Sequence, residues 1–116
     1  MPANTVNLGK TTIAPDVLIS IARLTALSVP GVSRLSSGPT EINRLFKKAG
    51  QEGVDITVEG NTVFVDLFVI IERDMNVRDV SHAVQSQVSR AISEMVGMDV
   101  GKVNVHVEDI DYTKAG

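Results

Sequence analysis

The sequence contains no cysteine and no tryptophan, and only 3% of its 116 residues are aromatic. The absence of cysteine excludes disulfide bonds and thiolate metal sites, and it fits a reducing compartment. No window approaches the run of about 18 apolar residues that a membrane-spanning helix needs. The first ten residues contain no apolar run typical of a signal peptide. We therefore expect a soluble, cytoplasmic protein.

The net charge of −3 argues against a dedicated nucleic-acid binder, because phosphate contacts need a concentrated positive patch. With 43% hydrophobic residues, the chain is long enough for one core and too short for two. We expect a flexible N-terminus at residues 1–10, a single domain at 11–110 and a C-terminal tail at 111–116.

The stretch from 76 to 108 predicts a helix followed by a strand. Its apolar residues recur at steps of three and four, as on one face of a helix: Val77, Val80, Val84, Val88, Ala91, Ile92 and Met95. Asn76 is a good N-cap, and Gly97 suits a left-handed residue at the helix end. After it, valines at 103, 105 and 107 alternate with Asn104, His106 and Glu108, which is typical of a strand with one buried face.

A β-hairpin is predicted between residues 54 and 71, with Gly60-Asn61 as a two-residue turn. In this register the apolar residues pair across the strands on one side of the sheet: Val58 with Val63, Ile56 with Val65, and Val54 with Leu67.

The alternate positions of the second hairpin strand are also apolar, which is unusual for a face in contact with water. Phe64, Phe68 and Ile70 point away from the valine face. Either the first helix or a segment at 40–49 covers them, or they form an interface with another subunit or a partner. We therefore regard these three residues as a candidate interaction site.

A first helix is predicted from Pro15 and Asp16 to Ser28, because proline suits the first turn and an acid suits the positive helix end. Residues 17–28 are apolar around most of the helix, so we expect it to be largely buried. The order helix, hairpin, helix, strand predicts an α+β two-layer sandwich, with a sheet of at least three strands packed on helices.

The segment 33–53 is irregular and basic, with a possible short helix at 40–49. Arg34, Arg44, Lys47 and Lys48 form either a solvated surface or a docking segment for an acidic partner or anionic lipid. The GXXG pattern at 50–53 keeps a nucleic-acid-associated module using residues 34–53 as the alternative function.

The sequence does not combine a nucleophile with a base. His82 and His106 lie on separate elements and are expected on the surface. An acidic cluster, made of Glu72, Asp74, Glu108, Asp109 and Asp111, is either a Ca²⁺ or Mg²⁺ site or a solvated strand end. We expect no enzyme activity, no cofactor, no metal and no catalytic residue.

Several segments together resemble the alkaline shock protein family, the envelope-stress proteins of Gram-positive bacteria. They are GKTTIAPDVL at 9–18, IAR at 21–23, VPGV at 29–32, VFVDL at 63–67, Val84-Gln85 with Val88, MVGM at 95–98 and VNVHV at 103–107. One departure is the run at 72–75, Glu-Arg-Asp-Met, where relatives typically have a tyrosine-glycine turn.

The resemblance implies a small non-enzymatic cytoplasmic protein linked to cell-envelope homeostasis. In some members it implies association with the inner side of the membrane through a small membrane-anchored partner. We therefore expect a scaffold of the envelope stress response that acts through protein–protein contacts, with a partner protein or as a homo-oligomer. The family supplies no catalytic residues.

Overall fold

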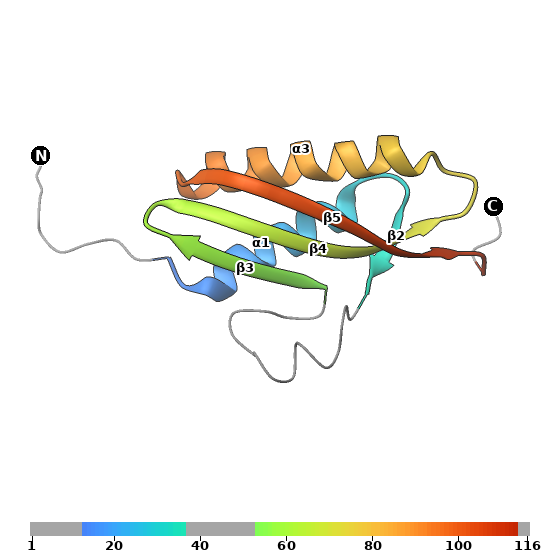
Figure 1. Ribbon diagram of the computed structural model, residues 1–116, viewed down its shortest axis with the longest axis horizontal. Coiled ribbons are helices and arrows are strands. Elements are labelled where there is room, and N and C mark those ends of the chain that lie inside the picture. The colour runs from blue at the N-terminus through green and yellow to red at the C-terminus, as the bar shows by residue number, and fades with distance from the viewer. Residues whose placement is uncertain (1–12, 37–52, 114–116) are drawn as a thin grey trace, which may run out of the picture.

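The computed structural model describes residues 13–36 and 53–113, which contain two helices and four strands (Figure 1). In chain order they are α1 (Pro15–Ser28), β2 (Val32–Leu35), β3 (Val54–Glu59), β4 (Thr62–Glu72), α3 (Val77–Val96) and β5 (Asp99–Asp111). The α+β class and the hairpin are confirmed. The predicted order lacked β2, and the expected helix at 40–49 lies outside the described residues.

Strand β4 pairs with each of the other three strands. It is antiparallel to β2 and β3 and parallel to β5. Because β5 accompanies β4 along its whole length, β2 and β3 share the opposite edge of β4, end to end (Figure 1). The sheet is therefore mixed, with β4 in the middle.

The two shorter strands meet at Phe68 of β4. Its backbone N–H donates to the carbonyl oxygen of Gly53 at 2.9 Å, and its carbonyl oxygen accepts from the N–H of Ser36 at 2.7 Å. Strand β4 thus passes from β3 to β2 with both backbone groups of Phe68 paired, as buried strands require.

Helix α3 has the termini that the sequence predicted. The side chain of Asn76 accepts from the backbone N–H of Asp79 at 3.0 Å, and Gly97 is left-handed with φ +71°. Val80, Val84, Val88 and Ile92 are buried. The predicted apolar face was too wide at both ends, because Val77 and Met95 are 39% and 68% exposed.

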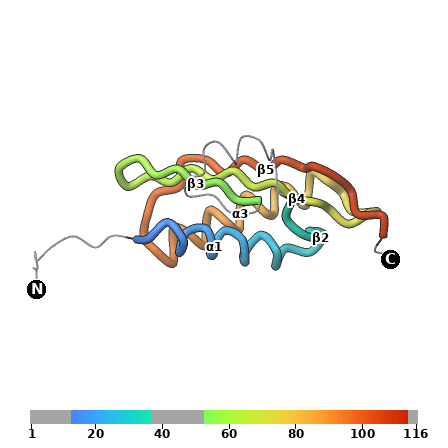
Figure 2. The backbone as a smooth tube through the Cα atoms, turned by 90° about the horizontal axis from the view of Figure 1, so that it is seen from below, coloured from blue at the N-terminus to red at the C-terminus, as the bar shows by residue number. Residues whose placement is uncertain are grey.

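Helix α1 is less buried than the sequence suggested. Leu18, Ile19, Ala22 and Ala26 form its buried face. Leu24, by contrast, is 60% exposed. The expectation of a largely buried helix was wrong, because α1 forms one side of a two-helix layer and covers only part of the sheet (Figure 2).

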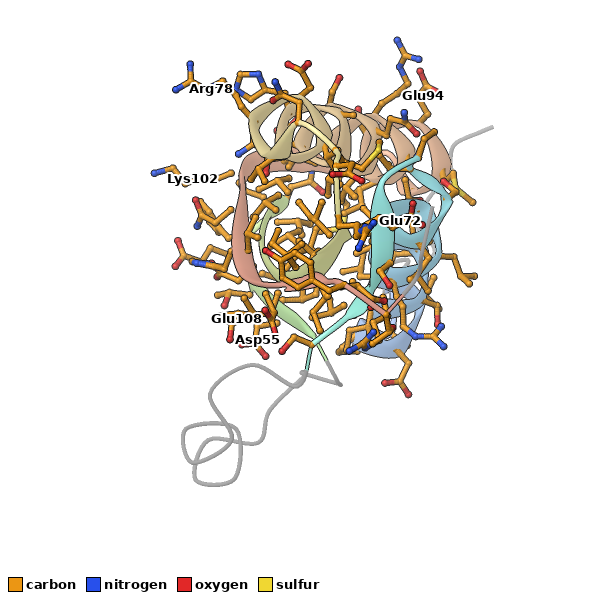
Figure 3. The ribbon with its side chains drawn as sticks, turned by 90° about the vertical axis from the view of Figure 1, so that its right-hand side faces the viewer. Asp55, Glu72, Arg78, Glu94, Lys102 and Glu108 are labelled. Atoms are coloured by element: carbon orange, nitrogen blue, oxygen red, sulfur yellow. The ribbon has the colours of Figure 1, made fainter. Side chains whose placement is uncertain are left out.

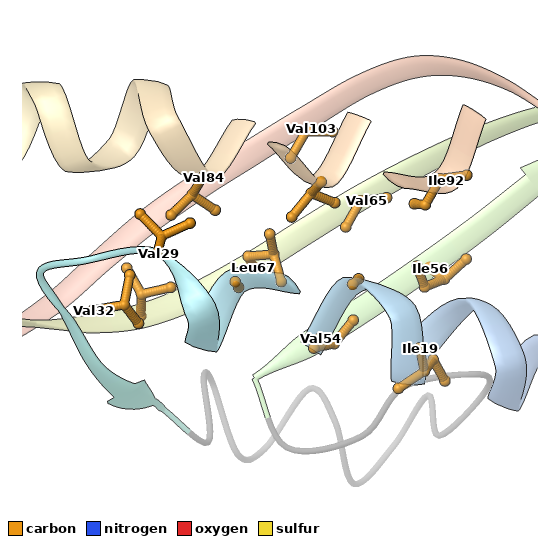
Figure 4. Packing of buried hydrophobic residues seen from close by; sticks show 14 of the residues in the cluster. Ile19, Val29, Val32, Val54, Ile56, Val65, Leu67, Val84, Ile92 and Val103 are labelled. Carbon is orange, nitrogen blue, oxygen red and sulfur yellow. The ribbon is translucent and has the colours of Figure 1, made fainter. Parts of the chain in front are cut away.

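Both helices pack on the same face of the sheet. The fully buried positions of β4 are Val63, Val65, Leu67, Val69 and Ile71. Figure 4 shows Val84 and Ile92 of α3 on the side of Val65, and Ile19 of α1 near Val54 and Ile56 of β3. The two-layer arrangement is confirmed, and the core is made almost entirely of valine, leucine and isoleucine.

The hairpin has the predicted register, with Val58 opposite Val63 and Val54 opposite Leu67. Gly60 has φ +64°, whereas the φ of Asn61 is not positive. Positive φ at the first turn residue alone is typical of a type II′ turn. The primed turn that the sequence predicted is therefore present.

Replacing Gly60 by valine is expected to lower the free energy of unfolding by about 1 kcal/mol or more, because a β-branched residue tolerates positive φ badly. No heavy atom lies within 4 Å of the position of an added Cβ, so the effect comes from the backbone. Urea denaturation measures it, and an unchanged midpoint would contradict the turn assignment.

Candidate functional site

The face of the sheet opposite the helices carries the candidate interaction residues. We call it the helix-free face and define it by Asp55, Phe64, Asp66, Phe68 and His106. The phenylalanines are half-buried. Within the described residues no helix covers them, since α1 and α3 both lie on the other side (Figure 3). The alternative cover at 40–49 lies outside the described residues.

Ile70, the third predicted residue, differs from the two phenylalanines. It is only 9% exposed and pairs with Arg34 of β2. Strand β2, which the sequence analysis missed, therefore flanks Ile70 and leaves little of it available to a partner.

Phe68 is held in place by its neighbour on β5. Its ring stacks on the ring of His106, with centroids 4.6 Å apart and planes inclined by 14°. Asp66 Oδ1 lies 3.0 Å from Nε2 of His106 and accepts a hydrogen bond from Nδ2 of Asn104 at 3.1 Å. These polar contacts fix the position of the imidazole, and the imidazole supports the phenyl ring.

Phe64 lies over the backbone of Gly101 on β5. A Cβ added to Gly101 would lie 2.4 Å from Cε1 of Phe64, which is closer than any real contact. The register of β4 and β5 shifts at this point, between Val63 and Phe64. The glycine thus leaves room for the phenyl ring beside the backbone of the edge strand.

Two carboxylates face each other on this surface. Asp55 of β3 lies directly opposite Asp66 of β4 in the register. Partial burial, and then repulsion by Asp66, raise the pKa of Asp55 above its usual value. Figure 3 shows Asp55 and Glu108 on the same side of the sheet, away from the helices. The helix-free face is therefore acidic as well as aromatic.

Asp55→Asn is expected to stabilise the protein at pH 7 by about 0.5 kcal/mol, the scale of a like-charge pair across strands. Because the folded-state pKa of Asp55 is raised, its contribution favours folding when the carboxyl is protonated. This contribution is lost as the pH rises from about 4 through the folded pKa. Denaturation at pH 4 and pH 7 checks this: an equal effect of the substitution at both pH values would contradict it.

Asp111 joins the far ends of β5 and β2. Its Oδ2 accepts from the hydroxyl of Ser33 and from Nη1 of Arg34 at 3.0 Å, and its Oδ1 accepts from the N–H and hydroxyl of Thr113. The hydrogen bonds from Ser33 and Thr113 hold the pKa of Asp111 far below its usual value. The sequence analysis placed Asp111 in the tail, but it is the buried last residue of β5.

Asp111→Asn is expected to destabilise the protein at neutral pH and to have a smaller effect at pH 2. A depressed pKa means that the ionised carboxyl stabilises the fold above the unfolded value of about 3.9, and that this contribution is lost as the pH falls. Thermal unfolding of both proteins from pH 2 to pH 7 measures the difference. A constant gap between the two curves would contradict an electrostatic role.

The predicted basic docking segment is only partly described. Arg34 lies on β2 and forms an ion pair with Asp111. Arg44, Lys47 and Lys48 lie outside the described residues. The basic docking segment therefore stays a prediction, with Arg34 as its one described residue.

Three of the five acidic residues that the sequence suggested as a metal cluster have partners within the protein. Asp109 accepts from the N–H of Ile110 at 2.8 Å, Asp74 pairs with Arg73, and Asp111 is engaged as described above. In residues 13–36 and 53–113, no group of three histidine or acidic side chains is placed to hold a metal ion.

A second apolar surface lies on the helical layer, and the sequence analysis did not single it out. Val17, Ile21 and Leu24 of α1 line a hollow of about 370 Å³ together with Met95 of α3. The sequence did contain a signal for this surface, because α1 has more apolar positions than one buried face can use.

In the part of the chain that the structure describes, neither helix is both long and apolar enough to span a membrane.

The fold and the helix-free face together define a small α+β module in which both described helices cover the same side of the sheet. The chain belongs to the alkaline shock protein 23 family, whose model, described as having a cell envelope-related function, matches residues 3–112. The family resemblance noted in the sequence is thereby confirmed.

The similar curated proteins come from Gram-positive bacteria. The uncharacterized proteins YloU and YqhY of Bacillus subtilis are each 26% identical, over 90% and 94% of this chain and 91% and 83% of their own. The uncharacterized protein Spy1535 of Streptococcus pyogenes is 32% identical over 89% of this chain and 80% of its own.

Two solved structures of the MamM CTD, each of which carries one or more substitutions, have a fold similar to that of this chain. One matches 83% of this chain and 95% of its own with a TM-score of 0.56 and 14% identity. Another matches 84% of this chain and all of its own with a TM-score of 0.54 and 13% identity. At this identity the likeness concerns the fold alone.

Proposed function

We propose that this protein is a non-enzymatic scaffold of the cell-envelope stress response, which acts through protein–protein contacts at the cytoplasmic side of the membrane. The family supports the link to the envelope. The helix-free face supports the mode of action, and the observation that carries the proposal is that Phe64 and Phe68 lie there with no described helix over them.

Aromatic side chains are enriched at protein interfaces, because they contribute a large contact area from a rigid ring. Here both rings contact the neighbouring strand β5, Phe68 through the ring of His106 and Phe64 through the backbone of Gly101. Rings held in this way lose little conformational freedom on binding, which favours association.

The polar groups of the helix-free face support binding better than catalysis. His106 and Asp66 form a pair, but their side chains are 45% and 40% exposed on an open sheet surface. Acid–base chemistry benefits from a site that excludes water, and this pair lies in water beside Asn104. Its contribution here is to orient the imidazole ring that stacks on Phe68.

The proposal is tested by complementation of a strain that lacks this protein, grown under alkaline challenge. Wild type is expected to restore growth, and the double variant Phe64→Ser/Phe68→Ser is expected not to. Leu24→Ser, an exposed apolar residue on α1, serves as the control and should restore growth fully. A folded double variant that complements as well as wild type would remove the helix-free face from the function.

Nucleic-acid binding, the alternative from the sequence, receives no support from the described residues, since Arg34 is engaged by Asp111. It predicts RNA or DNA affinity that falls steeply between low and physiological salt. Self-association through the helix-free face also stays a prediction, and light scattering on concentrated protein measures it.

A further inference from the structure

We infer that the occupant of the helix-free face is a basic, partly apolar segment of a partner protein rather than a second copy of this chain. The inference rests on the proposed function, since it assumes that the face is a contact surface. It adds the chemistry of the partner, which follows from the arrangement of charges and rings.

The charges on this surface are mainly negative. Asp55 and Asp66 lie opposite each other near its centre, and Glu108 lies on the same side. The nearby basic groups are engaged or peripheral. His106 contacts Asp66, and Arg34, opposite Ile70, pairs with Asp111. Lys102, opposite Phe64, extends outward from the edge strand β5 (Figure 3). A partner therefore meets a negative field.

The same face of a second copy would carry negative charges as well. A two-fold symmetric interface presents the same patch from both subunits, so the carboxylates of Asp55 and Asp66 would approach their own copies. Like charges brought together in an interface oppose association. The phenylalanines favour contact, but the carboxylates beside them disfavour contact with an identical surface.

The spacing of the rings and carboxylates defines the complementary surface. Phe64, Asp66 and Phe68 are alternate residues of one strand, so ring, carboxylate and ring follow one another at intervals of about 7 Å. A cationic side chain over Asp66 also reaches Asp55, and it relieves the repulsion between the two acids. Apolar side chains on either side of that cation then contact the two rings.

An arginine suits the central position better than a lysine. Its planar guanidinium can bind two carboxylate oxygens at once and can stack on an aromatic face. Both kinds of group are present here, two carboxylates and two half-buried phenyl rings, within one stretch of sheet. The partner segment is thus expected to place arginine between apolar residues.

The test uses a fluorescein-labelled peptide in which leucine and arginine alternate, and a matched peptide in which leucine and glutamate alternate. Anisotropy is expected to show binding of the arginine peptide only, with affinity decreasing as salt is raised. Asp55→Asn/Asp66→Asn should weaken binding by about tenfold or more, since both charges are lost from the contact.

The control variant is Asp16→Asn/Glu94→Gln, which removes the same net charge from the helical layer. It should bind the arginine peptide like wild type. Equal weakening in both double variants would mean nonspecific attraction and would overturn the inference. Absence of binding to wild type would overturn it as well.

Two further measurements locate the contact. Amide shifts in NMR spectra are expected to change at Asp55, Phe64, Asp66 and Phe68; changes confined to the α1 surface around Leu24 would contradict the inference. A wild type that dimerises, with a Phe64→Ser/Phe68→Ser variant that stays folded and monomeric, would make a second copy the occupant.

The complementation experiment tests the proposed function separately from the basic partner. If the arginine peptide fails to bind while the Phe64→Ser/Phe68→Ser variant still fails to complement, the helix-free face remains functional and only the basic partner is wrong. If the variant complements fully, the proposed function falls whatever the peptide does.

Discussion

Leu67→Ala is expected to lower the free energy of unfolding by about 2 to 5 kcal/mol, one of the largest effects of any single substitution in this chain. Leu67 is fully buried in the central strand, between the hairpin partner Val54 and the parallel partner Val105. Truncation removes apolar contacts and leaves a cavity beneath both helices. Neighbouring elements cannot close it, because β4 is fixed on both edges.

The matched control is Leu24→Ala, the same chemical change at a residue that is 60% exposed on α1. It is expected to stay within about 0.5 kcal/mol of wild type, as exposed positions usually do. Urea denaturation of the two variants, with equal m-values, gives the comparison. A small loss in the free energy of unfolding for Leu67→Ala would mean that the core has been assigned to the wrong face of β4.

Gly53→Ala is expected to cost about 3 kcal/mol or more, because strain and overlap both act at this position. Gly53 has φ +80°, and an added Cβ would lie 2.6 Å from Cβ of Leu35 and 2.7 Å from the carbonyl oxygen of Ser36. The substitution would therefore push β2 away from the start of β3. Thermal or urea unfolding measures the loss.

Gly60→Ala separates the two causes. Gly60 also has positive φ, but nothing lies within 4 Å of an added Cβ. Its expected cost is about 1 kcal/mol, from the backbone alone. If Gly53→Ala and Gly60→Ala lowered the free energy of unfolding by the same amount, the close approach of Leu35 and Ser36 to Gly53 would not contribute to the cost.

Local patterns in the sequence predicted the local elements well. Helix α3 follows from a valine repeat with a cap at each end, and the hairpin follows from two alternating runs around Gly60. In both cases the residues that determine the structure are neighbours in the chain. Periodicity and turn chemistry contain that information.

Features that depend on distant residues were not predicted. Strand β2 has four residues and no distinctive alternation, and it forms because β4 offers a free edge beyond the end of β3. The support of Phe68 by His106 requires β5 to lie parallel beside β4, and strand order cannot be derived from one sequence. The position of Phe64 and Phe68 on one face was predicted, because side chains alternate along a strand.

The central position of β4 also determines how the protein opens. Each of the other strands is hydrogen-bonded to β4, and both helices pack on its buried side chains. Its amides can therefore reach solvent only when most of the structure is lost, so their hydrogen exchange should report global unfolding. The outer edge of β5 should exchange sooner, through local fluctuations. The amides of β4 are thus expected to be the slowest to exchange. Phe64 and Phe68 therefore belong to the most rigid strand of the sheet.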